Sequence, residues 1–166
     1  MQPIKEVKLP TAIPTEKIYE NIKANKTKAF QLYKNNDWRH AYPIAIVGGG
    51  PSLKDTLPEL RNFQRIIVCG SAHDYLLENF ITPEWCAVVD PDPIVIEYLK
   101  LRHGDVKYLL ASQCDPLVFE YLKDYQVYVW HAHGEGYDMS IYDDHLRVGG
   151  GCTVGTRAIA LALGMG

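Results

Sequence analysis

The residues best suited to chemistry begin with the glycine-rich stretch Ala45–Leu53. An apolar, β-branched run ends in three glycines, followed by a proline, a serine and a helix-like segment. Glycine lets the backbone adopt positive φ and approach a ligand, and the N–H groups of a helix N-terminus favour an anion. We expect a cradle for phosphate or ribose, with a tight turn that binds nothing as the alternative. Its residues are Gly48, Gly49, Gly50, Pro51 and Ser52.

Two aspartates, Asp90 and Asp92, follow another apolar run. Mg²⁺ binds few protein carboxylates and keeps several waters, and a transferring phosphoryl group needs such a cation to offset its charge. We expect both aspartates to hold Mg²⁺ and Asp90 to be catalytic. Hydrogen bonding to a sugar or base is an alternative role, and capping of a helix that begins near Pro93 is the structural alternative.

A histidine pair, His131 and His133, follows the last expected strand of the sheet. In extended backbone the two rings lie on one side, because side chains alternate with a period of two. Such a pair can bind a metal or supply a general base near neutral pH. We treat both as candidate catalytic residues, with a solvated loop as the alternative.

Small residues mark two further places for a ligand. Gly70 and Ser71 follow an apolar run, where they leave room for a ligand unless Ser71 caps the next helix. The second glycine-rich turn spans Gly149–Gly155, and close packing of a helix on the sheet is its alternative explanation. Its candidate ligand-binding residues are Gly150, Gly151, Thr153 and Thr156.

Short apolar runs alternate with helix-like segments after residue 40. The expected strands are Pro43–Val47, Arg65–Cys69, Trp85–Val89, Lys107–Leu110 and Gln126–Trp130. The expected helices are Leu53–Arg61, His73–Phe80, Pro93–Arg102, Pro116–Lys123 and Thr156–Leu163. Strands without polar alternation suit a parallel sheet buried on both faces. We predict an α/β, Rossmann-like doubly wound domain with a mainly parallel sheet of five or more strands, which binds its ligand at the carboxyl ends of the strands.

The chain is expected to have two parts. Residues 1–40 form an N-terminal arm and a helix over Thr15–Asn36, and residues 41–166 form the nucleotide-binding domain. A helix that ends a doubly wound pattern normally leads to another strand. We therefore expect either a truncated domain or a homo-oligomer that covers the exposed edge.

The bulk composition excludes several classes of protein. A net charge of −3 does not suit a nucleic-acid binder, and no apolar run is long enough for a membrane span or resembles a signal peptide. We expect a cytoplasmic protein. The four cysteines lack any C-x-x-C spacing and are expected to be free, mostly buried thiols. They are Cys69, Cys86, Cys114 and Cys152.

The glycine turn fits neither common nucleotide motif. A P-loop needs a lysine after its last glycine, and no Gly-Lys pair occurs in the chain. A dinucleotide fingerprint needs a third glycine where Leu53 stands, and an acidic residue after the second strand, where the chain has Gly70. NAD is therefore disfavoured.

Three motifs together resemble the MptE-like family, also called domain of unknown function 115. The stretch Gly48–Leu53 matches its Gly-x-Gly-Pro-Ser-Leu element. The segment Ile81–Trp85, followed by Val88–Pro91, is similar to its Pro, strand and Asp-Pro element, and Gly149–Gly155 is similar to its second glycine turn. In this order they cover residues 43–166.

The resemblance implies a nucleotide-dependent transferase that acts on a small-molecule acceptor. The family includes archaeal 6-hydroxymethyl-7,8-dihydropterin diphosphokinases and bacterial flagellin-glycosylation proteins, and it resembles bacterial sialyltransferases that grip CMP. We expect diphosphoryl transfer from Mg-ATP, with use of a CMP-linked or other nucleotide-sugar as the alternative. A non-catalytic nucleotide-binding fragment is the third possibility, because the family's next strand, with its Gly-x-Asp turn, is missing.

Overall fold

The protein is a parallel β-sheet with helices on both faces. The computed structural model describes residues 13–26, 28, 31–32, 42–133, 140, 147–151 and 153–164. The strands are β1 (Gln31–Leu32), β2 (Ile44–Val47), β3 (Arg65–Cys69), β4 (Trp85–Val88), β5 (Lys107–Ala111), β6 (Gln126–Ala132) and β7 (Arg147–Val148). They are ordered β1-β6-β5-β4-β3-β2, β7 pairs with the end of β6, and these pairings are parallel.

The core of the sheet confirms the five predicted strands. All four residues of β4 are buried, as are the last four of β3 and of β5. Ile67, Cys86 and Leu109 lie on three neighbouring strands and have no exposed surface. Strands covered on both faces need apolar side chains at consecutive positions, which explains the absence of polar alternation in the sequence.

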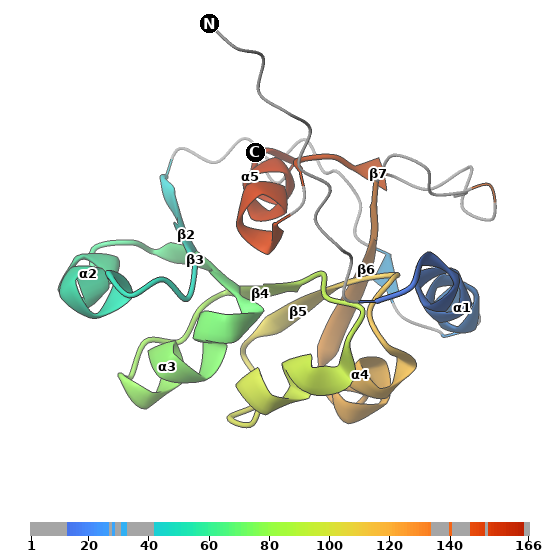
Figure 1. The fold of residues 1–166 in the computed structure, drawn as a ribbon. Helices are drawn as coiled ribbons and strands as arrows, with labels where there is room; N and C mark the ends of the chain where they lie inside the picture. The colour runs from blue at the N-terminus through green and yellow to red at the C-terminus, as the bar shows by residue number, and fades with distance from the viewer. Residues whose placement is uncertain are drawn as a thin grey trace, which may run out of the picture.

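Helices cover both faces of the sheet (Figure 1). The α-helices are α1 (Thr15–Lys26), α2 (Leu53–Leu60), α3 (His73–Glu78), α4 (Pro116–Tyr121) and α5 (Val154–Gly164), and the 3₁₀ helices are η1 (Gly70–Ala72) and η2 (Pro93–Tyr98). From β2 to β6 each strand lies beside the next, and α2, α3 and α4 lie on one face. Helix α5 packs against β2 and β3 from the opposite face, so the Rossmann-like arrangement is confirmed.

Two expected helices differ from the prediction by more than two residues at an end. The helix expected over Thr15–Asn36 ends at Lys26, and Gln31–Leu32 pairs with β6, because tertiary strand pairing overrides a weak helical pattern. The helix expected over Pro93–Arg102 is the 3₁₀ helix η2, which ends at Tyr98. Beyond it, the Asp74 carboxylate accepts hydrogen bonds from the N–H groups of residues 100 and 101, which directs the chain away from helix.

The cysteines that the structure describes are free and buried, as predicted. Burial raises the pKa of the Cys69 thiol to about 11 and raises those of Cys86 and Cys114 as well. These thiols therefore stay protonated and act as small apolar side chains. Cys152 lies outside the described residues.

Within the described parts of the chain, no helix has both the length and the apolar character needed to cross a membrane.

Candidate functional site

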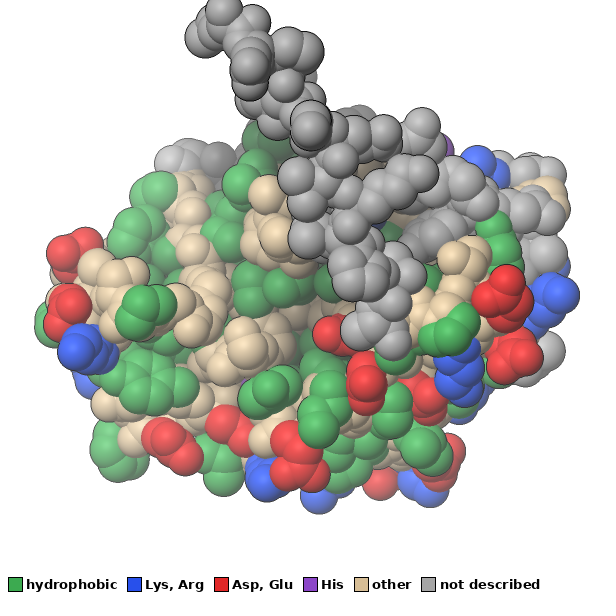
Figure 2. Space-filling model, in the orientation of Figure 1, with side chains coloured by type: hydrophobic (Ala, Val, Ile, Leu, Met, Phe, Trp, Pro, Cys, Tyr) green, Lys and Arg blue, Asp and Glu red, His purple; other side chains and the backbone are tan. Residues whose placement is uncertain are grey.

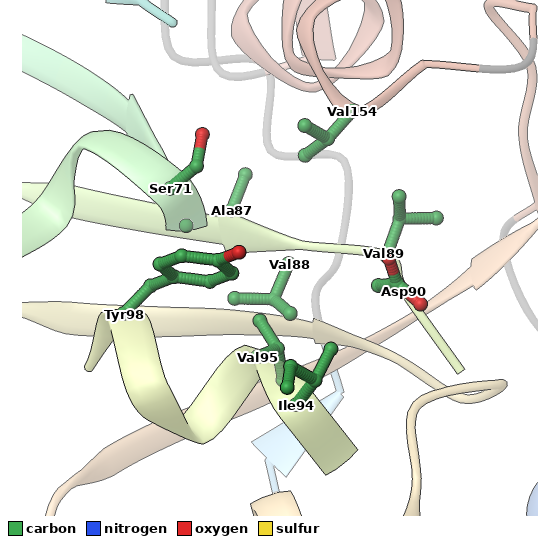
Figure 3. A pocket seen from close by; sticks show the side chains of 10 residues that line it. Ser71, Ala87, Val88, Val89, Asp90, Ile94, Val95, Tyr98 and Val154 are labelled. Atoms are coloured by element: carbon green, nitrogen blue, oxygen red, sulfur yellow. The ribbon is translucent and has the colours of Figure 1, made fainter. Parts of the chain in front are cut away.

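A pocket lies at the carboxyl ends of β3 and β4, where a parallel α/β sheet binds its ligands. Its volume is about 250 Å³. Figure 3 shows it between the side chains of η2 and the first residue of α5, Val154. The lining residues are Gly70, Ser71, Ala87, Val88, Val89, Asp90, Ile94, Val95, Tyr98 and Val154. Three of them, Gly70, Ser71 and Asp90, were candidates from sequence.

The glycine turn after β2 lies beside this pocket. A Cβ atom at Gly49 would come within 2.6 Å of the Ser71 Oγ atom, so a side chain there would displace the hydroxyl of a residue that lines the pocket. A Cβ at Gly48 or Gly50 would meet nothing within 4 Å. None of the three has the positive φ that the sequence suggested. Close packing against Ser71 therefore explains Gly49, whereas neither packing nor backbone conformation explains a glycine at the other two positions.

The turn presents backbone donors to solvent. Residues 48–52 are exposed, and the N–H groups of Gly49, Gly50 and Ser52 donate no hydrogen bond to the described part of the chain. Helix α2 begins one residue later, and the Ser52 side chain does not cap it. Pro51 lies in the turn before the helix. Free N–H groups before a helix are suited to bind an anion.

Ser71 does not cap the next helix, which was its alternative role. It lies inside η1, and α3 begins at His73 without a side-chain cap. Ser71 is exposed, its hydroxyl lies beside Gly49, and it lines the pocket. It therefore connects the glycine turn with the pocket.

The two aspartates after β4 have different roles. Asp90 is exposed and lines the pocket, and its Oδ1 atom accepts a hydrogen bond from the Asp92 N–H at 3.0 Å. Asp92 caps η2 by accepting a hydrogen bond from the Ile94 N–H at 2.8 Å. The capping alternative thus holds for Asp92, and Asp90 is the aspartate that lines the pocket.

The residues around Asp90 suit Mg²⁺ only if a bound ligand and water supply most of the coordinating oxygen atoms. No group of three or more His, Cys, Asp or Glu side chains among the described residues could hold a metal. Mg²⁺ is commonly held by one or two carboxylates together with substrate phosphates and water. The Oδ2 atom of Asp90 accepts no hydrogen bond from the described residues. Asp90 therefore fits a cation that arrives with a phosphorylated ligand.

Asp90 is held in place by residues that the sequence did not suggest. The Asn21 side chain, on α1, donates hydrogen bonds to the carbonyl oxygens of Pro91 and Gln113, at 3.2 and 3.0 Å. The Gln113 side chain donates to the carbonyl of Val89 at 2.8 Å. The carbonyls on both sides of Asp90 are thus fixed by side-chain amides. No local pattern shows these contacts, because they join distant segments.

The histidine pair does not reach the pocket. His131 is buried within β6, whereas His133 is exposed just beyond it, where its N–H donates to the carbonyl of Val148 at 2.9 Å. Strand β5 separates β6 from β4, so the pair lies about 10 Å from the Asp90 strand, at the usual strand spacing. Neither histidine lines the pocket.

The second glycine turn forms the entry to α5. Gly150 and Gly151 have φ of 123° and 84°, and a Cβ at Gly150 would lie 2.8 Å from the Thr156 carbonyl oxygen. Thr153 caps α5, because its Oγ1 accepts from the Thr156 N–H at 3.2 Å, and the two hydroxyls are 3.0 Å apart. Close packing and capping therefore explain these four residues, and α5 reaches the pocket through Val154.

A buried polar chain joins α3 to β5. His73 has no exposed surface, and its ring lies 2.8 Å from the Asp74 carboxylate and 3.3 Å from the Tyr108 hydroxyl. Burial lowers the pKa of His73, although Asp74 acts in the opposite direction. The neutral ring links α3 to β5. This role of His73 could not be predicted from the sequence, because a single histidine forms no recognisable motif.

Comparison with known proteins gives the family. The profile described as "6-hydroxymethylpterin diphosphokinase MptE-like" matches residues 16–166, which is most of the chain. The chain belongs to the MptE-like family. A search of curated protein sequences finds no significant match.

The fold of this MptE-like chain is similar to part of a solved glycosyltransferase. The structure of the MAf glycosyltransferase from Magnetospirillum magneticum AMB-1 aligns with a TM-score of 0.73 and 17% sequence identity. The alignment covers 90% of this chain and 25% of that one. The chain thus spans about a quarter of the length of this neighbour, and at this identity the likeness shows the fold.

Proposed function

We propose that this MptE-like domain is part of a nucleotide-dependent transferase, and that the Gly48–Ser52 turn receives the phosphates of the donor. The observation that carries the proposal is the turn itself. It exposes N–H groups that donate to no described residue at a helix entry, and Gly48 and Gly50 have neither a close contact nor a positive φ that would require glycine. Ligand access is the remaining reason for side chains to be absent there.

The family description favours diphosphoryl transfer from Mg-ATP. In such a reaction the acceptor hydroxyl oxygen bonds to the β-phosphorus, the bond from that phosphorus to the α,β-bridging oxygen breaks, and AMP leaves with the electron pair. The hydroxyl proton passes to a base. Bound Mg²⁺ would offset charge on the phosphates. Asp90 would hold it, and the N–H groups of the turn would fix the phosphates.

Transfer of a sugar from a nucleotide-sugar is the second candidate. The similarity to the MAf glycosyltransferase favours it. It uses the same phosphate cradle but depends less on Asp90 as a metal ligand, since a diphosphate or monophosphate leaving group can be bound by N–H donors. The two candidates therefore differ in their need for Mg²⁺.

Two matched glycine variants test the phosphate cradle. A Cβ at Gly50 or at Gly104 would meet no atom within 4 Å, so alanine should leave the fold intact at both positions. We expect Gly50→Ala to weaken binding of pyrophosphate by about tenfold or more, or about 1.4 kcal/mol. Gly104→Ala should bind as the unmodified protein does. Isothermal titration calorimetry measures both, and equal affinity in the two variants would refute the cradle.

The choice between the two reactions is tested with Asp90→Asn. If ATP binding is strengthened by Mg²⁺ and this dependence is lost in the variant, the diphosphokinase is supported. If CMP or a CMP-sugar binds without Mg²⁺ and ATP does not, the glycosyltransferase is supported. Binding raises the melting temperature by mass action, so a thermal-shift series with and without Mg²⁺ gives the answer.

A further inference from the structure

The pocket has a different chemistry from the glycine turn. Its walls are made mostly by aliphatic side chains, with the ring of Tyr98 at one side (Figure 3). Asp90 is its one charged residue, and no lysine, arginine or histidine lines it among the described residues. A phosphate buried between the aliphatic walls would have no lysine, arginine or histidine beside it to offset its charge. The pocket therefore takes an uncharged part of the ligand.

Two large apolar side chains are left exposed around this pocket. Ile94 and Tyr98 are both on η2 and are 54% and 46% exposed. Val95, between them, is buried and forms the floor with Val88. Figure 3 shows Val154 across the opening from these residues, with Ser71 above the Tyr98 ring. Figure 2 shows the same side of the molecule, with hydrophobic side chains among uncharged side chains and backbone near the centre and most charged side chains below and outside it.

We infer that this pocket binds the nucleobase of the donor, with Tyr98 as its stacking surface. The inference rests on the proposed function, since it assigns a second part of the same ligand. A flat heterocycle has two apolar faces and polar atoms only at its edge, which matches apolar walls with a few polar groups at the rim. Those groups are the Ser71 hydroxyl, the Asp90 carboxylate and the Tyr98 hydroxyl.

A sugar ring matches this lining less well. Its hydroxyl groups project in several directions, and each needs a polar partner when it is buried. The described lining offers three polar side chains against six aliphatic ones. The volume of about 250 Å³ is also below the roughly 300–1,000 Å³ of sites that enclose a whole drug-sized ligand. The pocket suits one planar ring system.

Ser71 joins the two parts of the site. Its hydroxyl lies against the Gly49 position and the residue also lines the pocket. A ligand with phosphate on the turn thus extends directly into the pocket. This continuity points to the base of the phosphorylated donor and not to a separate acceptor.

Ligand pairs that differ only in the base test the inference. CMP and AMP carry the same phosphate as ribose 5-phosphate but add a heterocycle. We expect at least one of the two nucleotides to bind the protein more tightly than ribose 5-phosphate. Tyr98→Ala should lower the affinity for that nucleotide by about 5- to 100-fold, which is the range seen when an aromatic stacking partner is removed. The affinity for ribose 5-phosphate should not change. Tyr98→Phe, which keeps the ring, should restore most of the affinity.

Two controls separate stacking from loss of structure. Tyr75→Ala removes an exposed tyrosine that does not line the pocket, and it should leave nucleotide binding unchanged. Ile94→Ala, a second variant of the same wall, should lower the affinity for the nucleotide but not the affinity for ribose 5-phosphate. The unliganded melting temperature of each variant shows whether it folds.

The outcomes also distinguish this inference from the proposed function. If ribose 5-phosphate and the nucleotides bind equally, or if Tyr98→Ala has no effect, the base site is refuted and the phosphate cradle stands. If Tyr98→Ala weakens the binding of ribose 5-phosphate as much as that of the nucleotide, the base assignment is refuted in favour of a sugar subsite. If none of these phosphates nor pyrophosphate binds, the cradle itself fails.

Discussion

Phe80 is the one described residue other than glycine with positive φ, 59°, and it is 90% exposed. It ends α3 in a Schellman arrangement, in which the Ile81 N–H donates to the Leu76 carbonyl at 2.9 Å and the Phe80 N–H to the Leu77 carbonyl at 3.0 Å. Glycine is the usual residue at this position, because a Cβ atom makes left-handed backbone unfavourable. Because the phenyl ring is exposed, its packing contributes little to offset this unfavourable backbone conformation.

Phe80→Gly should therefore stabilise the protein. We expect the free energy of unfolding to rise by about 0.5–1 kcal/mol, since relief of the left-handed strain exceeds the added chain entropy. That corresponds to an increase of about 1–4 °C in melting temperature for a domain of this size. Phe80→Ala removes the same ring but keeps the Cβ atom, and should give no such gain. A Phe80→Gly protein that melts at or below the Phe80→Ala variant would contradict this explanation.

Among the elements, α1 holds the ligand-binding edge in place through two asparagines one turn apart. Asn21 and Asn25 are 1% and 2% exposed, and each side chain donates two hydrogen bonds to backbone carbonyls. Those of Asn25 go to Ser112 and Cys114, at 2.9 and 2.7 Å. Only Asn21 contacts the segment that carries Asp90, through the Pro91 carbonyl.

Replacing either asparagine by leucine should destabilise the protein by a similar amount. Each change leaves two carbonyl acceptors without their donor, at a cost of about 1–3 kcal/mol. The two variants should differ locally. Asn21→Leu should speed hydrogen exchange of the Asp92 N–H, which donates to Asp90, whereas Asn25→Leu should not. Chemical denaturation and amide exchange by NMR measure the two effects, and equal exchange at Asp92 would exclude α1 as its support.

For the molecule as a whole, acid should weaken the fold through His73. Burial is the main reason that the pKa of His73 is lowered from its ordinary value of 6.5, and the like charge of His103 adds to it, against the opposing effect of Asp74. A lowered pKa means that the unfolded chain takes up a proton before the folded one does. This contribution to stability is therefore complete above pH 6.5 and is lost as the pH falls through the lower folded pKa.

The free energy of unfolding should thus decrease between pH 7 and 5. The uptake of one proton on unfolding changes the free energy of unfolding by at most about 1.4 kcal/mol per pH unit. His73→Gln should lose part of this slope, whereas His103→Gln, which removes only the smallest contribution to the shift, should retain most of it. Urea titrations at several pH values measure the slopes. Identical slopes for His73→Gln and the unmodified protein would place the titration elsewhere.

A second, more acidic step is expected from Glu84. Burial by itself would raise its pKa, but the hydrogen bonds and charges of Arg65 and Lys107 outweigh this, and the pKa lies below its ordinary value. The Arg65 Nε atom lies 2.8 Å from the Glu84 carboxylate. This contribution is present above pH 4.5 and lost as the pH falls through the folded pKa, so Glu84→Gln should flatten the stability curve there.

Short windows of the sequence determined the five strands β2 to β6, the glycine turn and the family, but not the two-residue strands β1 and β7. Apolar runs bounded by glycine and proline predict buried strands, since the signal lies within a few neighbouring residues. The place of Asp90 at a strand's carboxyl end follows from the same pattern. The three motifs likewise indicated the family that the comparison shows.

Only the tertiary structure decided which of these residues meet. It separates His131 from the pocket by a strand, assigns Asp92 to a helix cap, and adds Tyr98 and Val154 to the lining. It also places the Asn21 side chain against the backbone carbonyl groups of Pro91 and Gln113, which lie 70 and 92 positions further along the chain. Such contacts depend on how whole elements pack, because a side chain's partners across a sheet are set by strand order and register, which no short window contains.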